Sequence, residues 1–177
     1  MDLSALMLNG NLLPGRWPAT PQDIETYFVN GLSDRRQRIW ADWLELTQAL
    51  REATLDQVAT AWLGGSFFTD TDEPGDIDCV YIVDWVVLLA ARAHADAAQF
   101  LEVVATSQAC DAFDLLVDSY ILEWHPFAGV QPPQAAKDYL ERRGYWDDLW
   151  SRRRSTDQRE DSLPVHGYLE VTLDGFL

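Results

Sequence analysis

Two aspartates separated by one residue form the pattern in this sequence that is best suited to chemistry. Asp76 and Asp78 follow a Pro-Gly turn and lead into an apolar run that continues to Val83. Alternate residues of a β-strand project to the same face, so both carboxylates are expected side by side, with Ile77 turned into the core. Carboxylates this close repel each other unless a cation lies between them. A divalent metal bound by oxygen ligands is the simplest reason to build such a pair.

A glycine pair and a serine, Gly64-Gly65-Ser66, end an apolar run nine residues before the aspartates. Gly65-Ser66, the spacer and Asp76-Ile77-Asp78 together resemble the motif of the DNA polymerase β-like nucleotidyltransferase superfamily, particularly its minimal members. The resemblance covers residues 58–82. It implies that Gly65 and Ser66 hold nucleotide phosphate. It also implies that both aspartates and a third carboxylate on a later strand bind two Mg²⁺ (or Mn²⁺) ions.

Three aspartates are candidates for the third carboxylate that the resemblance requires. The run from Phe113 to Trp124 is rich in β-favouring residues and predicts a strand. Asp114 lies near the start of that strand and is the preferred residue, with Asp111 and Asp118 as the alternatives. Under the resemblance, this carboxylate completes the metal site on the attacking side and serves as general base.

The activity implied by the resemblance is nucleotidyl transfer from a nucleoside triphosphate to a protein, RNA or small-molecule acceptor, as in toxin–antitoxin and phage-related systems. One departure is the spacer, which carries Asp70, Asp72 and Glu73 and no base, where many relatives have an arginine. Triphosphate binding beside this charge requires compensation by metals or by the run Arg152–Arg154. The alternative interpretation is a catalytically degenerate fold that acts as an acidic protein-binding module.

The composition fits one domain with a substantial core: the chain has 177 residues, of which 47% are hydrophobic. A formal charge of −16 argues against general DNA binding and against acidic membranes. Seven of the thirteen basic residues lie between Lys137 and Arg159. Cys79 and Cys110 lack Cys-x-x-Cys spacing, and no run reaches the roughly 18 apolar residues of a membrane span. A reduced, cytoplasmic protein without membrane association is therefore expected.

The expected fold class is α/β (α+β), a nucleotidyltransferase-like mixed sheet of about four strands flanked by helices. An extended lead, 1–20, is expected to pack on a single domain, 21–177, in which 133–177 form a C-terminal helix and a closing strand. The expected strands are 58–63, 77–83, 113–124 and 168–173, with the last at the sheet edge. The expected helices are 21–28, 34–52, 84–106 and 134–154. Near the start of the second helix, a solvated face is expected from Arg35, Arg36 and Arg38.

Overall fold

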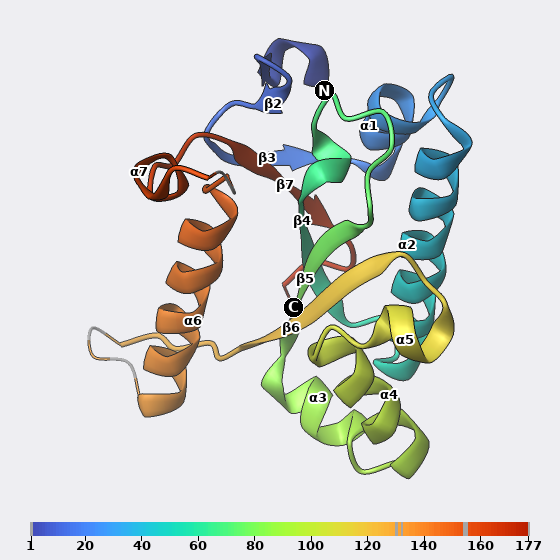
Figure 1. The fold of residues 1–177 in the computed structure, drawn as a ribbon. Helices are drawn as coiled ribbons and strands as arrows, with labels where there is room; N and C mark the ends of the chain where they lie inside the picture. The colour runs from blue at the N-terminus through green and yellow to red at the C-terminus, as the bar shows by residue number, and fades with distance from the viewer. Residues whose placement is uncertain (1, 130, 132, 154–155, 177) are drawn as a thin grey trace.

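A five-stranded mixed β-sheet forms the centre of the molecule (Figure 1). The computed structural model describes residues 2–129, 131, 133–153 and 156–176. The sheet order is β3-β7-β4-β5-β6, with β3 (Gly15–Ala19), β4 (Val58–Gly64), β5 (Ile77–Asp84), β6 (Val117–Trp124) and β7 (Gly167–Thr172). The pairs β3/β7 and β5/β6 are parallel, whereas β4 is antiparallel to both of its neighbours. The expected α/β architecture is confirmed, with five strands in place of four.

The N-terminal segment supplies the additional strand. Within residues 1–20, β3 forms one edge of the sheet, and it is preceded by the 3-10 turn η1 (Leu3–Leu6) and a hairpin of β1 (Met7–Leu8) and β2 (Asn11–Leu12). Pro18 in β3 has no N–H to donate, and an edge strand is where a sheet tolerates proline. Because β3 occupies this edge, β7 lies inside the sheet, and the expected edge position of the closing strand is wrong.

The N-terminal helices begin at polar caps, as the sequence predicts. Thr20 Oγ1 accepts a hydrogen bond from Asp23 N at 3.1 Å, and Ser33 Oγ accepts one from Arg36 N at 3.4 Å. The elements that follow these caps are α1 (Pro21–Ile24), the π-helical turn η2 (Glu25–Val29) and α2 (Asp34–Ala53). The apolar side of α2 packs on one face of the sheet, with Ile39, Trp43, Leu46 and Leu50 all buried in the main core.

Three short helices replace the single helix expected over 84–106 and the start of the next expected strand. They are α3 (Trp85–Ala91), α4 (Ala95–Ala105) and α5 (Ala109–Phe113). The break after α3 allows both halves to bury apolar residues, among them Leu88 and Val104, in the same core.

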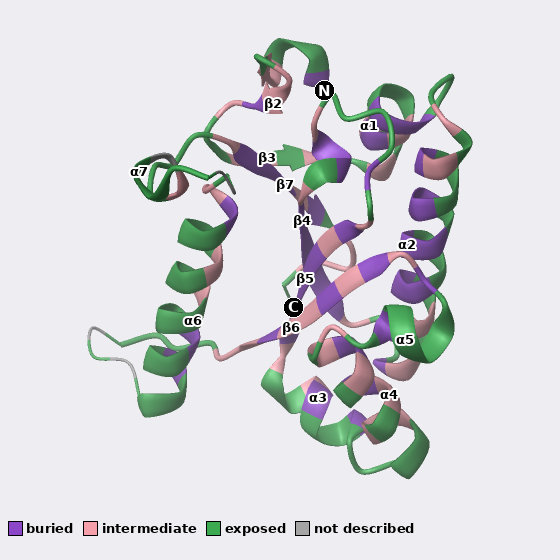
Figure 2. Cartoon of the chain, viewed as in Figure 1, coloured by how far each residue is buried: buried purple, intermediate pink, exposed green. Residues whose placement is uncertain are grey.

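The opposite face of the sheet is covered in part by α6 (Gln134–Trp150), which α7 (Gln158–Asp161) follows (Figure 1). A second core cluster lies under α6 and consists of Trp62, Val80, Ile82, Leu122, Tyr139, Trp150 and Tyr168. Figure 2 shows buried residues along the strands and the inner side of α2, whereas α6 is mostly exposed. In the described part of the chain, no helix is long and apolar enough to cross a membrane.

Candidate functional site

Two carboxylates face each other at the start of two parallel strands. Asp78 is the second residue of β5, Asp118 is the second residue of β6, and the two are partners in the strand register. Neighbouring strands lie about 4.8 Å apart, and directly opposed residues share a face, so these side chains are adjacent. Val80 and Leu122 follow on the same face and belong to the cluster under α6. The aspartate pair therefore lies on the α6 side of the sheet.

The prediction that Asp114 lies on a strand is wrong. Helix α5 ends at Phe113, and Asp114 caps it in the left-handed conformation with φ 58°. Its side chain is 94% exposed, and its Oδ2 lies 3.1 Å from Arg38 Nη2. The apolar Leu115, which made this segment resemble a strand, is instead buried in the connection between α5 and β6. Asp111 lies on α5 itself, so Asp118 is the alternative that the fold brings next to Asp78.

A sequence signal for Asp118 exists in the way the two strands begin. Ile77-Asp78-Cys79 and Val117-Asp118-Ser119 each place an aspartate between an apolar residue and a small residue. Both small residues are fully buried, which turns the aspartate between them to the other face. Comparison of the two strand starts therefore favours Asp118 over Asp114.

Two hydroxyl groups hold the carboxylate of Asp118. Ser107 Oγ donates a short hydrogen bond to Oδ1, and Tyr120 OH donates to Oδ2 at 3.5 Å. Ser107 has a left-handed backbone with φ 61°, and its N–H donates to Ser119 O at 3.0 Å, which fixes the hydroxyl beside the strand. Burial raises the pKa of Tyr120, and the negative charges of Asp118 and Asp78 also raise it. The phenol therefore remains a donor at neutral pH.

The Gly64-Gly65-Ser66 turn lies against Asp78. Gly65 has φ 84° and ψ −172°, and a Cβ on it would overlap Asp78 Oδ2. Gly64 is the register partner of Asp78, and the nearest atom of the Trp150 ring lies only 3.2 Å from where a Cβ of Gly64 would be. Ser66 is exposed at the start of the 3-10 turn η3 (Ser66–Phe68). The fold thus brings Gly65 and the strand carboxylate into contact.

The residues available to bind a metal ion at this site are the carboxylates of Asp78 and Asp118. Asp76 is half-buried, immediately before β5. Among the described residues, no group of three or more His, Cys, Asp or Glu side chains is arranged to hold a metal ion. The strand register brings Asp118 next to Asp78, and Asp76 precedes Asp78 by two residues. Mg²⁺ is commonly held by one or two carboxylates together with substrate phosphates, so the pair fits an ion that binds with a nucleotide.

Two arginines of α2 hold the acidic spacer loop. Arg36 is buried, so the expectation of a solvated face is wrong for this residue. Its guanidinium donates to four carbonyl oxygens, those of Phe28, Phe67, Thr69 and Thr71. Burial lowers the pKa of Arg36, and the charges of Asp72 and Glu73 act in the opposite direction. Arg35 donates to both carbonyls of the Pro74-Gly75 turn. Arg35 and Arg36 therefore position the backbone of the spacer loop.

Arg152 and Arg153 lie in the connection that follows α6. Arg152 Nε donates to Asp148 Oδ2 at 2.7 Å, and Arg152 Nη1 donates to Ser162 O at 3.0 Å. Arg153 lines a separate cavity of about 190 Å³ beside the N-terminal hairpin. Arg154 lies outside the described residues. Arg152 therefore contacts the C-terminal connection, and Arg153 lies beside the N-terminal hairpin.

The chain matches a family of unknown function (DUF6932) over residues 5–172 and belongs to that family. No curated protein and no solved structure matches it. The matched span includes all five strands of the sheet and the aspartate pair.

Proposed function

We propose that the protein is a Mg²⁺- or Mn²⁺-dependent nucleotidyltransferase that uses a nucleoside triphosphate. The observation that carries the proposal is the opposed pair Asp78 and Asp118, with the Gly65 turn in contact with Asp78. Like charges directly opposite each other destabilise a pair of strands, and a bound cation removes that penalty. The order glycine turn, strand, aspartate is also the order in the superfamily that the sequence resembles.

In the proposed reaction, the acceptor oxygen bonds to the α-phosphorus while the bond from that phosphorus to the bridging oxygen breaks. Pyrophosphate leaves with the electron pair of the broken bond. When bound, the metal supplies neutralisation of the phosphate charge and a lowered pKa for the acceptor hydroxyl. Asp78 and Asp118 would hold the metal through carboxylate oxygens, and Asp76, two residues before Asp78, would assist. The acceptor proton passes to a carboxylate oxygen of Asp118.

The turn before the spacer supplies the proposed phosphate contacts. The proposed donors to phosphate oxygens are the backbone N–H groups around Gly65, beside the Asp78 carboxylate that fills the space a side chain of Gly65 would need. The exposed hydroxyl of Ser66 adds a donor at the same turn. Thr69 Oγ1 donates to Ser66 O at 2.7 Å and holds η3 in place.

The proposal also covers the acceptor of the nucleotidyl group and the cellular location of the protein. A protein, an RNA or a small molecule is the acceptor, in a toxin–antitoxin or phage-related setting. Cys79 and Cys110 are both free thiols, which favours a reducing, cytoplasmic environment.

Binding of labelled ribonucleoside triphosphates in the presence of Mn²⁺ tests the proposal. The wild type is expected to bind at least one of the four common nucleotides. Asp78→Asn and Asp118→Asn are each expected to weaken binding at least about ten-fold, because each removes a charge from the metal site. Asp114→Asn removes the same charge from an exposed position and is the matched control, with binding expected within about two-fold of the wild type.

Two results contradict the proposal. One is the absence of binding for all four nucleotides with correctly folded wild-type protein. The other is binding that survives unchanged in both Asp78→Asn and Asp118→Asn.

A further inference from the structure

A cavity of about 620 Å³ opens between the start of α2 and the acidic spacer loop. One wall comes from η2 and the residues that lead into α2, and the other wall comes from residues 69–72. Met7 of β1 adds to the lining, which does not include Asp78 or Asp118. The volume is in the range of ligand pockets, about 300–1,000 Å³. We call this cavity the spacer groove.

The helical wall of the spacer groove is apolar although it is open to solvent. Tyr27 is 37% exposed and Leu32 is 47% exposed, while Phe28 lies in the core beside them. Large apolar side chains that line an open groove are typical of interaction sites. This wall suits an apolar side chain or the aliphatic stem of a long one.

The loop wall of the spacer groove is acidic and firmly held. Asp70 and Asp72 are both exposed on it. Arg36 Nη2 donates to Thr69 O at 2.8 Å, Ser33 Oγ donates to Asp72 O at 3.0 Å, and Asp70 N donates to Gly10 O at 3.0 Å. The backbone is thus anchored to two other segments of the fold, so that binding requires little ordering of the loop.

The guanidinium of Arg36, which lines the groove, is hydrogen-bonded within the protein. Arg36 is only 4% exposed, and its Nη1 and Nη2 atoms both donate to carbonyl oxygens. In the sequence, Glu73 follows the lining residue Asp72, and Asp34 and Arg35 lie between the lining residues Ser33 and Arg36 with opposite charges. The spacer groove therefore presents an apolar wall and an acidic wall to a ligand.

We propose that the spacer groove binds a basic segment of a partner protein. An arginine or lysine of that segment extends its aliphatic stem along Tyr27 and Leu32 and places its cationic head at Asp70 and Asp72. An apolar neighbour in the segment fills the remaining space beside Met7. The charge of −16 selects this occupant, because it attracts basic segments and repels nucleic acids and acidic peptides. This inference does not depend on nucleotidyl transfer.

Fluorescence anisotropy with a labelled peptide of alternating arginine and leucine tests the inference. The wild type is expected to bind this peptide and not its glutamate–leucine counterpart, with an affinity that falls as salt is raised. The double variant Asp70→Asn/Asp72→Asn is expected to bind about ten-fold more weakly, because two exposed ion pairs are lost. Leu32→Ser is expected to weaken binding several-fold without any change of charge.

The matched control is Glu45→Gln/Glu102→Gln, which removes two exposed charges from the outer sides of α2 and α4. Its affinity is expected to stay within about two-fold of the wild type. Equal weakening in this control and in the groove variant would overturn the inference, since it indicates general charge attraction. Absence of peptide binding at low salt would also overturn it. So would salt-sensitive self-association that the groove variant abolishes, because a second copy would then be the occupant.

Discussion

Gly65 has a backbone conformation that glycine alone adopts easily, and this conformation places the turn on Asp78. Its φ of 84° and ψ of −172° lie in a region that costs other residues about 1–3 kcal/mol. The space beside its Cα is filled by the Asp78 carboxylate. Gly65 therefore determines both the path of the chain after β4 and the surroundings of Asp78, the candidate metal ligand.

Gly65→Ala is expected to lower the free energy of unfolding by more than about 2 kcal/mol, because backbone strain and overlap with Asp78 Oδ2 add together. Urea unfolding followed by circular dichroism measures this change. The control is Gly75→Ala in the turn at the other end of the spacer, where an added Cβ meets nothing within 4 Å. Gly75→Ala is expected to change stability by less than about 1 kcal/mol. Equal effects of the two substitutions would show that the Gly65 turn is not constrained as described.

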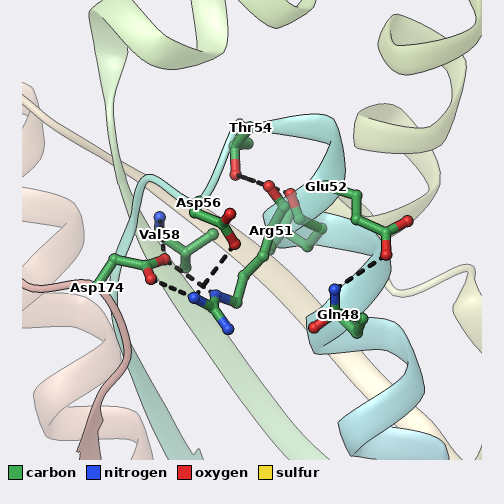
Figure 3. Close-up of polar contacts among 8 residues, drawn as sticks. Gln48, Arg51, Glu52, Thr54, Asp56, Val58 and Asp174 are labelled. Carbon is green, nitrogen blue, oxygen red and sulfur yellow. Dashed lines mark hydrogen bonds and ion pairs between the residues drawn. The ribbon is translucent and has the colours of Figure 1, made fainter.

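A charge network joins α2, β4 and the C-terminal segment (Figure 3). Arg51 of α2 donates to both oxygens of Asp174, through Nη2 at 2.6 Å and Nε at 3.2 Å. The N–H of Val58, the first residue of β4, donates to Asp174 Oδ2 at 3.0 Å. Asp56 also pairs with Arg51, at 3.2 Å. The side chain of Asp174 is 12% exposed, whereas that of Asp56 is 69% exposed.

Substitution of Asp174 and Asp56, one at a time, compares the stability contribution of a buried ion pair with that of a solvated one. Asp174→Ala is expected to lower the free energy of unfolding by about 2–3 kcal/mol, because three charge-assisted bonds are lost and Val58 N is left without this acceptor. Asp56→Ala should cost less than about 1 kcal/mol. Chemical denaturation of the two variants makes the comparison. A larger loss for Asp56→Ala would contradict the structural role given to Asp174.

The elements that the sequence predicts well are those with strong local signals. Thr20 and Ser33 are N-caps before amphipathic runs, and β4 and β5 are short apolar runs between turn residues. β3 could not be predicted in the same way, because Pro18 weakens its strand pattern and its pairing with β7 spans most of the chain. The division of 84–106 into α3 and α4 lets Leu88 and Val104 reach the same core, and local propensity does not encode such contacts.

The proximity of Gly65 and Asp78 is predictable, because the two residues are close in sequence. Gly65 and Asp78 are joined by a short spacer, and the fold brings them into contact. The third carboxylate depends on where β6 starts, and a shift of four residues from Asp114 to Asp118 exchanges a helix cap for a strand position. The burial of Arg36 could not be predicted from the sequence. Its guanidinium is held by carbonyl oxygens that only the folded spacer loop brings together.

At the scale of the whole molecule, charge is distributed unevenly over the fold. Between Gly64 and Trp124, twelve acidic residues accompany a single basic residue, Arg92. Two acidic features result, the Asp78/Asp118 pair on the α6 side of the sheet and the spacer groove beside α2. Both attract cations, so a metal bound at the strand pair must be distinguished from one bound at the loop.

Paramagnetic broadening of backbone amide NMR signals by Mn²⁺ in the presence of a nucleoside triphosphate makes this distinction directly. The amides of Gly65, Asp78 and Asp118 are expected to lose intensity first, while those of Asp114 and of the loop at Asp70 keep theirs. Asp118→Asn should abolish this pattern. Broadening that begins at the spacer loop, or that is unchanged in Asp118→Asn, would contradict the claim that the opposed aspartates are the metal and nucleotide site.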